Sequence, residues 1–213
     1  MEKQKFSWDL FNAMPLIGII RNLSIKDIQY VMPLFIEAGF TNVEVTLNTK
    51  NASEAIEYII KEYAGKINIG AGTVCTIGDL NNAIQAGAQF IVSPIIKKEV
   101  IVKSTAMGIP IFPGALTPTE IYDAWEMGAP MIKVYPASTM GPDYITNVLS
   151  PLNSIKLLPT GGVNLNNIQA FMKAGAMGVG VGSELFNKSL IQSRDQNKLL
   201  AHFSLFKNEM NKH

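Results

Sequence analysis

The sequence predicts an α/β protein, and the fold class that it favours is a closed (β/α)8 TIM barrel with a short N-terminal helix. Eight short apolar runs alternate with segments of helical spacing, and a glycine recurs where a helix should end and the next strand begin. Eight such repeats are typical of a barrel of parallel strands. An open doubly wound sheet is the rival fold, but no expected strand is followed by a convincing Gly-x-Gly-x-x-Gly turn.

The expected strands are continuous apolar runs, so both faces of a parallel sheet should be covered by helices. They span residues 16–20, 42–47, 67–74, 90–94, 109–113, 131–135, 155–160 and 178–182. The glycines expected to end the first five helices lie 20 to 26 residues apart, at Gly39, Gly65, Gly87, Gly108 and Gly128. Helix starts are indicated at residues 24–27 and 117–120, where a serine or threonine precedes an acidic residue by three positions.

One domain is expected for residues 1–213, because a chain of this length with 47% hydrophobic residues can bury one large core. Within it we expect three segments. Residues 1–15 should hold an amphipathic N-terminal helix that Pro15 ends, residues 16–186 the barrel core, and residues 187–213 a closing C-terminal helix.

Charge and composition exclude several kinds of partner and site. Eighteen basic and 17 acidic residues leave a net charge of +1, so neither nucleic acid nor a membrane surface is an expected partner. With one cysteine, Cys75, and two histidines, His202 and His213, the chain lacks the residues for a disulfide, a zinc site or a Ser-His-Asp triad. No signal-like or membrane-spanning apolar run is present, and a cytoplasmic location is expected.

Two charged residues, Lys133 and Glu44, interrupt apolar strands. A lysine in apolar surroundings has a lowered pKa, and its neutral amine can attack a ketone to form an iminium. A carboxylate close to it could carry protons to and from the intermediates. Two structural alternatives stay open: a lysine that extends from an edge strand into solvent, and a buried salt bridge between the two residues.

The carboxyl ends of the strands, where such barrels place their working residues, carry further candidates. These are Arg21, Thr46 with Asn48, Thr73, Pro94 and Thr160. Two glycine-containing turns, Gly161 with Gly162 and Gly182 with Ser183, fit a phosphate site, because glycine lets backbone N–H groups approach an anion closely. The glycines at positions 70 and 72 have a structural alternative, which is that they only relieve crowding inside the barrel.

Seven short motifs now match a known family in order and spacing. They are Glu-Val-Thr-Leu at 44–47, Gly-Ala-Gly-Thr-Val at 70–74, Val-Ser-Pro at 92–94, Pro-Gly at 113–114, Lys-Val-Tyr-Pro-Ala at 133–137, Pro-Thr-Gly-Gly at 159–162 and Gly-Ser at 182–183. Together they resemble the 2-dehydro-3-deoxy-6-phosphogluconate (KDPG) aldolase family, which overlaps with 4-hydroxy-2-oxoglutarate (KHG) aldolase. The resemblance covers residues 15–186.

The resemblance implies a class I aldolase without metal or other cofactor, a homotrimeric barrel that cleaves a phosphorylated 2-keto-3-deoxy sugar acid into pyruvate and glyceraldehyde 3-phosphate. It also leaves room for cleavage of 4-hydroxy-2-oxoglutarate to pyruvate and glyoxylate. The Schiff-base lysine of the family falls on Lys133 and its proton-transfer glutamate on Glu44. The hydroxyls that contact pyruvate fall on Thr73 and Thr160, the apolar wall on Pro94 and Tyr135, and the phosphate loops on Gly161, Gly162, Gly182 and Ser183.

One departure concerns Asn48, where many members of the family have an arginine that binds the pyruvate carboxylate. An asparagine supplies no charge, so the carboxylate must be held by backbone N–H groups, by Thr73 or by Arg21. Related phosphogalactonate aldolases also have an arginine after the first strand but commonly lack the threonine of Thr160. The alternatives are therefore a phosphogalactonate-type aldolase, a sugar-phosphate isomerase or epimerase without a covalent intermediate, and a non-catalytic barrel.

Overall fold

The strands in the described part of the chain are short and pair in parallel. The computed structural model describes residues 5–212, and residues 1–4 and 213 of the predicted terminal segments lie outside the described residues. The strands are β1 (Leu16–Ile20), β2 (Asn42–Thr46), β3 (Asn68–Gly72), β4 (Phe90–Val92), β5 (Ile111–Phe112), β6 (Gly114–Ala115), β7 (Ile132–Val134), β8 (Leu157–Pro159) and β9 (Val179–Val181). All but β6 lie within the expected apolar runs.

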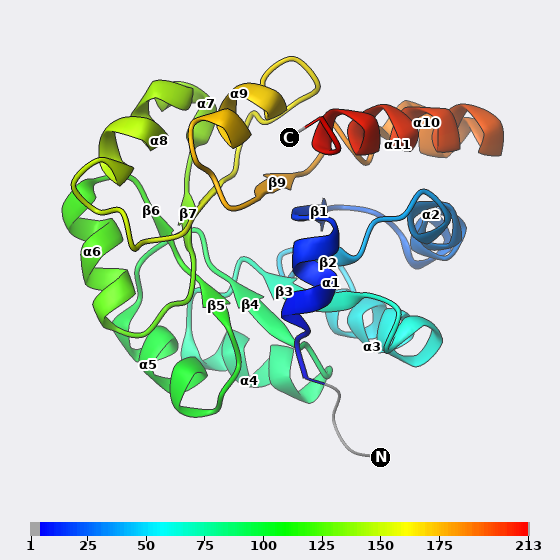
Figure 1. Cartoon of the computed structure of the whole chain (residues 1–213). Helices are drawn as coiled ribbons and strands as arrows, with labels where there is room; N and C mark the ends of the chain where they lie inside the picture. Colours follow the sequence, from blue (N-terminus) through cyan, green and yellow to red (C-terminus); the bar gives the residue numbers. More distant parts are fainter. Residues whose placement is uncertain (1–4, 213) are drawn as a thin grey trace.

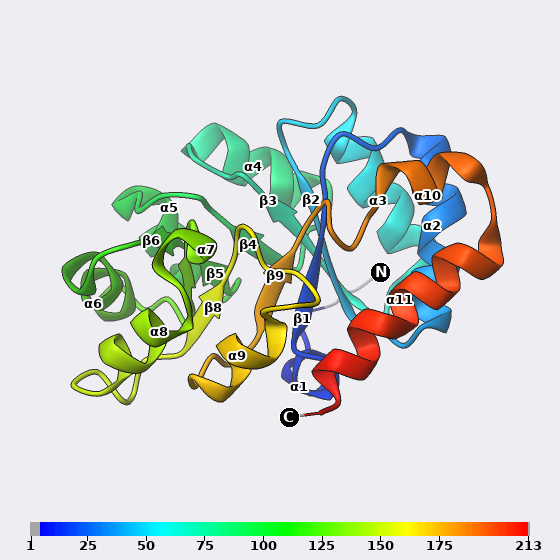
Figure 2. The same cartoon turned by 90° about the horizontal axis from the view of Figure 1, so that it is seen from above.

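The expectation of a closed TIM barrel of eight strands is wrong. The strands form two sheets, a six-stranded sheet in the order β5-β4-β3-β2-β1-β9 and a three-stranded sheet in the order β6-β7-β8. Helices surround the strands on the outside (Figure 1), and the view from above shows β9 beside β1 (Figure 2). The fold is a curled parallel half-barrel with a small second sheet, which is a related α/β architecture.

Pro113, the last residue of the fifth expected strand, separates β5 from β6. Proline has no N–H for a strand ladder, and the chain on its two sides pairs with different neighbours, β5 with β4 and β6 with β7. The backbone is also crowded there, since a Cβ on Gly114 would stand 2.4 Å from the carbonyl oxygen of Pro94. On the other side, β8 and β9 are not paired as a ladder in the described residues. They are joined by an isolated bridge between Thr160 and Gly180, and the carbonyl of Leu157 in β8 accepts from the N–H of Met177 (2.9 Å).

Apolar side chains fill both sides of the strands. Val43, Val45, Ile132 and Val134 belong to the large outer core between the strands and the helices. A second cluster, which includes Phe90 of β4, Phe112 of β5 and Phe11 of helix α1 (Trp8–Ala13), fills the inner side of the strands. Because both faces of the strands are buried, their sequences read as continuous apolar runs.

Most of the helices connect one parallel strand to the next. They are α1 (Trp8–Ala13), α2 (Ile25–Glu37), α3 (Ala52–Tyr63), α4 (Ile77–Gln85), α5 (Lys98–Ala106), α6 (Pro118–Glu126), α7 (Ala137–Met140), α8 (Pro142–Leu149), α9 (Ile168–Lys173), α10 (Lys188–Ser193) and α11 (Gln196–Met210). The helix starts predicted at Ser24 and Thr117 are confirmed, because each caps its helix in a reciprocal capping box. The glycines predicted to end the first five helices have φ between 68° and 94°, which glycine adopts without a Cβ penalty.

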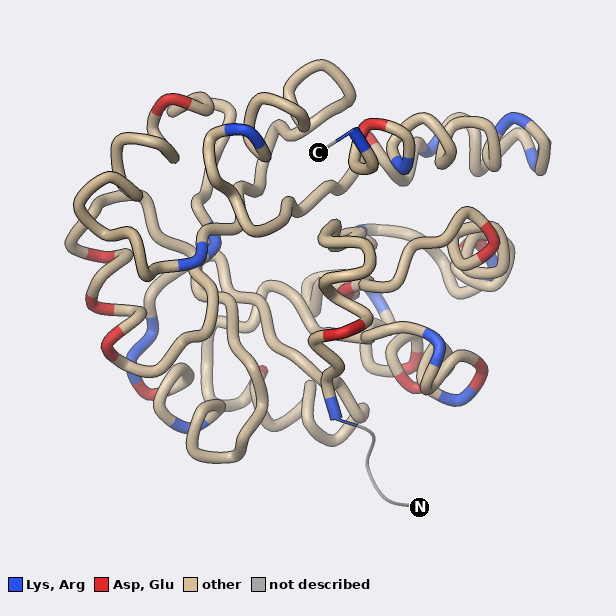
Figure 3. The backbone as a smooth tube through the Cα atoms, viewed as in Figure 1, with Lys and Arg blue, Asp and Glu red and all other residues tan. Residues whose placement is uncertain are grey.

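The C-terminal helix α11 packs against α2 (Figure 2), where the rings of Phe203 and Phe35 lie 5.9 Å apart. Figure 3 shows most charged residues on the surrounding helices and loops, away from the strands. In residues 5–212 no helix combines the length and the hydropathy needed to cross a bilayer.

Two buried asparagines tie the N-terminal segment to the amino ends of the strands. The amide of Asn68 donates to the carbonyl of Ser7 (2.7 Å) and to Oδ1 of Asn42 (2.8 Å), and its Oδ1 accepts from the N–H of Ser7 (2.8 Å). Asn42 in turn donates to the carbonyl of Met14 (2.7 Å). These bonds satisfy the polar groups that α1 brings against the strands.

Candidate active site

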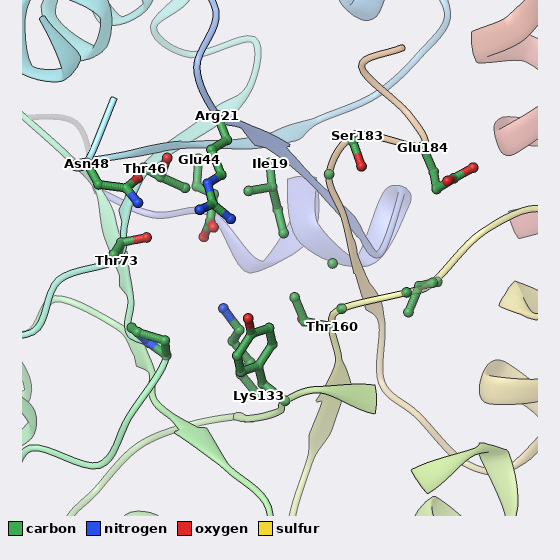
Figure 4. Close-up of a pocket in the computed structure, with 17 residues that line it drawn as sticks. Ile19, Arg21, Glu44, Thr46, Asn48, Thr73, Lys133, Thr160, Ser183 and Glu184 are labelled. Atoms are coloured by element: carbon green, nitrogen blue, oxygen red, sulfur yellow. The ribbon is translucent and has the colours of Figure 1, made fainter. Parts of the chain in front are cut away.

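A pocket of about 460 Å³ opens at the carboxyl ends of β1, β2, β3, β7, β8 and β9 (Figure 4). All twelve residues that the sequence proposes for the site line it: Arg21, Glu44, Thr46, Thr73, Pro94, Lys133, Tyr135, Thr160, Gly161, Gly162, Gly182 and Ser183. Asn48 lines it too. Sequence reasoning missed Ile19, Val163, Gly180 and Glu184. Ile19 could have been found from its place two residues before Arg21, at the end of the first strand.

Lys133 points into this pocket because of its place in β7. Its neighbours Ile132 and Val134 face the outer core, and side chains alternate along a strand, so Lys133 faces inward. Only 7% of its surface is exposed, and β7 is the central strand of its sheet, so the solvent-directed edge lysine is excluded. Burial lowers the pKa of the Lys133 amine, although Glu44 opposes that shift.

An aromatic ring covers the amine of Lys133. Its Nζ lies 4.9 Å from the ring centre of Tyr135, the distance of a cation–π contact. Tyr135 follows β7, and 41% of its surface is exposed. The ring can therefore stabilise positive charge on the lysine nitrogen and still face a ligand.

Glu44 reaches the pocket by the same alternation, since Val43 and Val45 of β2 face the outer core. Its carboxyl is buried, and its Oε2 has no hydrogen-bond partner among the described residues. Burial raises the pKa of Glu44 to about 7, and the positive charge of Lys133 only partly offsets this. A carboxyl with such a pKa can both give and accept a proton near neutral pH.

Glu44 and Lys133 do not form a direct ion pair. The ion pairs found in residues 5–212 all join other residues, while the two charges still influence each other through the pocket. The structural alternative of a closed, buried salt bridge is therefore not realised. Both groups face a space that a substrate can enter.

Arg21 and Asn48 lie at the ends of β1 and β2, and Figure 4 shows both side chains directed into the pocket. Among the described residues, the guanidinium of Arg21 has no hydrogen-bond or ion-pair partner. Thr73 follows β3 in the left-handed conformation, with φ of 59°, which is uncommon for a β-branched residue. This end of the pocket thus offers a cation with free donors, an amide and a hydroxyl.

The opposite end of the pocket is built from the loops after β8 and β9. Gly161 and Gly162 have φ of 90° and 75°, and their N–H groups, like that of Ser183, have no acceptor within residues 5–212. A Cβ on Gly162 would stand 2.2 Å from Oγ of Ser138, so only glycine fits there. Free backbone N–H groups in a glycine turn are suited to binding an anion.

Thr160, between these loops and the lysine, fits beside β9 because residue 180 is glycine. A Cβ on Gly180 would stand 2.5 Å from Oγ1 of Thr160, and the Thr160 hydroxyl donates to the carbonyl of Leu158 (3.2 Å). In the part of the chain that the structure describes, no group of three or more His, Cys, Asp or Glu residues is placed to hold a metal ion. The arrangement suits covalent chemistry on the carbonyl of an anionic substrate.

Comparison with known proteins agrees with the chemistry that the site suits. The sequence profile described as "Aldolase: KDPG and KHG aldolase" matches residues 9–202. The chain is 36% identical to 2-dehydro-3-deoxy-6-phosphogalactonate aldolase of Escherichia coli over 174 residues, 81% of this chain and 85% of the relative. It is 35% identical to 2-dehydro-3-deoxy-phosphogluconate aldolase of Treponema pallidum over 167 residues, 76% and 79% of the two chains.

A solved structure is similar as well. The KDPG aldolase of Legionella pneumophila, crystallised with pyruvate captured at low pH as a covalent carbinolamine intermediate, superposes with a TM-score of 0.85. Identity is 27%, over 92% of this chain and 95% of that chain. The chain therefore belongs to the KDPG and KHG aldolase family, a family of class I carbon–carbon lyases.

Proposed function

We propose that this aldolase cleaves 2-dehydro-3-deoxy-6-phosphogluconate into pyruvate and glyceraldehyde 3-phosphate through a Schiff base on Lys133. The observation that carries the proposal is the buried amine of Lys133, with its lowered pKa, facing the same space as the protonatable carboxyl of Glu44. A neutral amine is the nucleophile that a ketone requires.

The reaction proceeds in balanced steps. Nζ of Lys133 attacks the C2 carbonyl to give a carbinolamine. The protonated carboxyl of Glu44 gives a proton to the departing hydroxyl, so that loss of water leaves a protonated imine and a Glu44 carboxylate. Glu44 as carboxylate takes the proton of the C4 hydroxyl, the C3–C4 bond breaks, and its electron pair moves into the imine to give an enamine and the free aldehyde. Glu44 then returns a proton to C3, and water releases pyruvate from Lys133. The ring of Tyr135 stabilises the cationic nitrogen.

The remaining lining residues hold the two ends of the substrate. Arg21, Thr46, Thr73 and Thr160 bind the pyruvate half, with Arg21 supplying the charge that Asn48 lacks, and Pro94 completes the apolar wall. The free N–H groups of Gly161, Gly162 and Ser183, together with Gly182, take the phosphate at the opposite end. Two polar ends across an apolar wall match a substrate with a carboxylate and a phosphate.

Trapping with borohydride tests the covalent step. Incubation with pyruvate and borohydride should add one reduced pyruvate unit to the protein, located at Lys133 by peptide mass spectrometry. Lys133→Met should abolish the label. Lys156→Met is the matched control and should keep it, because Lys156 lies over the ring of Trp8 at 5.7 Å and does not line the pocket. An unlabelled wild-type protein would support a sugar-phosphate isomerase or epimerase instead.

A phosphogalactonate-type aldolase is the second candidate. It is favoured by Arg21 and Asn48 and by the relative named for that activity at 36% identity, whereas Thr160 favours the gluconate substrate. Pyruvate release from the two substrates, which differ in configuration at C4, decides between them. 4-Hydroxy-2-oxoglutarate belongs in the same panel, and equal rates on all three would contradict a gluconate preference.

Three further features complete the proposal. By analogy with the family we propose a homotrimer in the cytoplasm, each chain forming one domain over residues 1–213. Light scattering during size-exclusion chromatography measures the number of chains directly. A single cooperative unfolding transition in calorimetry is the outcome expected for one domain.

A further inference from the structure

The backbone on both sides of Arg21 is tied to two threonine hydroxyls, that of Thr46 at the end of β2 and that of Thr49 in the turn that follows. The N–H of Asn22 donates to Oγ1 of Thr49 (3.0 Å). Oγ1 of Thr49 lies 3.0 Å from Oγ1 of Thr46, and the Thr46 hydroxyl donates to the carbonyl of Ile20 (3.4 Å). The chain of bonds begins one residue after Arg21 and ends one residue before it.

Either hydroxyl can be the donor of the bond between Thr46 and Thr49. Each hydroxyl has one hydrogen to donate, so when Thr46 donates to the carbonyl of Ile20, Thr49 donates to Thr46. Thr49 and Thr46 are 5% and 4% exposed, so water does not readily replace a lost partner. Removing the Thr49 hydroxyl therefore leaves the N–H of Asn22 and Oγ1 of Thr46 each without this bond.

Apolar packing anchors the Arg21 loop at Leu23, which is buried in the outer core. Asn22 has the left-handed conformation, with φ of 55°. An open hollow of about 620 Å³, lined by Asn22 and Thr49 among others, adjoins the loop and shares no lining residue with the catalytic pocket. The hydrogen bonds at Ile20 and Asn22 are the polar restraint directly beside Arg21, in addition to the apolar packing of the loop.

We propose that Thr49 is a positioning residue for the aldolase reaction: its hydroxyl holds the loop so that the guanidinium of Arg21 meets the carboxylate of the 2-keto acid. This inference rests on the proposed function, in which Arg21 supplies the positive charge that Asn48 does not. Thr49 itself does not line the pocket. Thr49 also bonds Thr46, which lines the pocket, but the proposed effect on the carboxylate is exerted through Arg21.

The test compares Thr49→Val, which keeps the shape but loses the hydroxyl, with Thr49→Ser, which keeps the hydroxyl. We expect Thr49→Val to raise KM for pyruvate-releasing substrates about tenfold with kcat changed less than about threefold, and Thr49→Ser to stay within about threefold of wild type in both. If Thr49→Val does not fold, Thr49→Ala takes its place with the same expected result.

A double-mutant cycle with Arg21→Met separates positioning from a general structural effect. In the Arg21→Met protein the further change Thr49→Val should leave KM nearly unchanged, because the group that it positions is gone. The same KM increase with and without Arg21 would overturn the inference, as would an unchanged KM in Thr49→Val alone. If borohydride fails to label wild-type Lys133, the proposed function itself fails, whereas normal labelling with no effect of Thr49 refutes only this inference.

Discussion

Gly72 of β3 leaves the space that the carboxyl of Glu44 occupies. A Cβ at position 72 would stand 2.6 Å from Oε1 of Glu44, closer than a carbon and an oxygen can approach. The two residues lie on neighbouring strands, β3 and β2, which pair along their length. The glycine does relieve crowding, and the side chain that needs the room is the proposed proton carrier.

Gly72→Ala should therefore disable the enzyme without unfolding it. The added methyl displaces the Glu44 carboxyl, and a misplacement of this kind can cost about 100-fold in kcat. Steady-state pyruvate release measures the loss. Gly78→Ala in α4 is the matched control, because the nearest atom to its added Cβ is 3.5 Å away. Equal activity of the two variants would show that Glu44 tolerates displacement.

The raised pKa of Glu44 predicts how stability depends on pH. Its pKa is 4.5 when exposed and about 7 in the fold, so its contribution to stability is fully present below pH 4.5 and lost as the pH rises through 7. This difference between the two pKa values corresponds to roughly 3 kcal/mol of free energy. Relative to Glu44→Gln, whose side chain does not titrate, wild type should lose about that free energy of unfolding between pH 4.5 and pH 8.

Urea unfolding at a series of pH values measures this difference. Glu57→Gln, on the exposed face of α3, is the matched control and should follow the wild-type curve closely. A difference between wild type and Glu44→Gln that stays constant across the range would mean that the Glu44 carboxyl is not held neutral by burial.

Removing the ring beside Lys133 should weaken catalysis by a modest factor. Tyr135→Leu loses the cation–π contact at 4.9 Å, and at a partly exposed site such a contact contributes about 0.5–1 kcal/mol. We expect kcat to fall about two- to fivefold. Tyr135→Phe, which keeps the ring, should retain most of the activity; a loss as large as that of Tyr135→Leu would assign a role to the hydroxyl instead.

Asn68→Ala should destabilise the protein without changing its chemistry. The substitution removes the bonds to Ser7 and Asn42 and leaves buried polar groups unpaired, which we expect to cost about 2–4 kcal/mol in the free energy of unfolding. KM should not change, because Asn68 lies at the opposite ends of the strands from the pocket. The exposed Asn153→Ala is the control for stability.

The site residues could be predicted from the sequence more completely than the pairing of the strands. A charged residue within a buried apolar strand is visible in the sequence, so Lys133 and Glu44 stood out, and their strand-end neighbours followed from the rule for parallel strands. The hydrogen-bonded connections between strands are not visible in that way. The expectation of a closed barrel counted the apolar runs correctly as strands but missed that Pro113 separates β5 from β6.

The sequence by itself determined the alternation of apolar strands and capped helices. It also determined most of the residues that line the pocket, because local periodicity and buried charge are properties of short segments. The tertiary structure alone decided which strands pair, that Glu44 and Lys133 face each other without an ion pair, and that the Thr49 hydroxyl supports the Arg21 loop. These depend on contacts between residues far apart in the chain. No local pattern in the sequence records them.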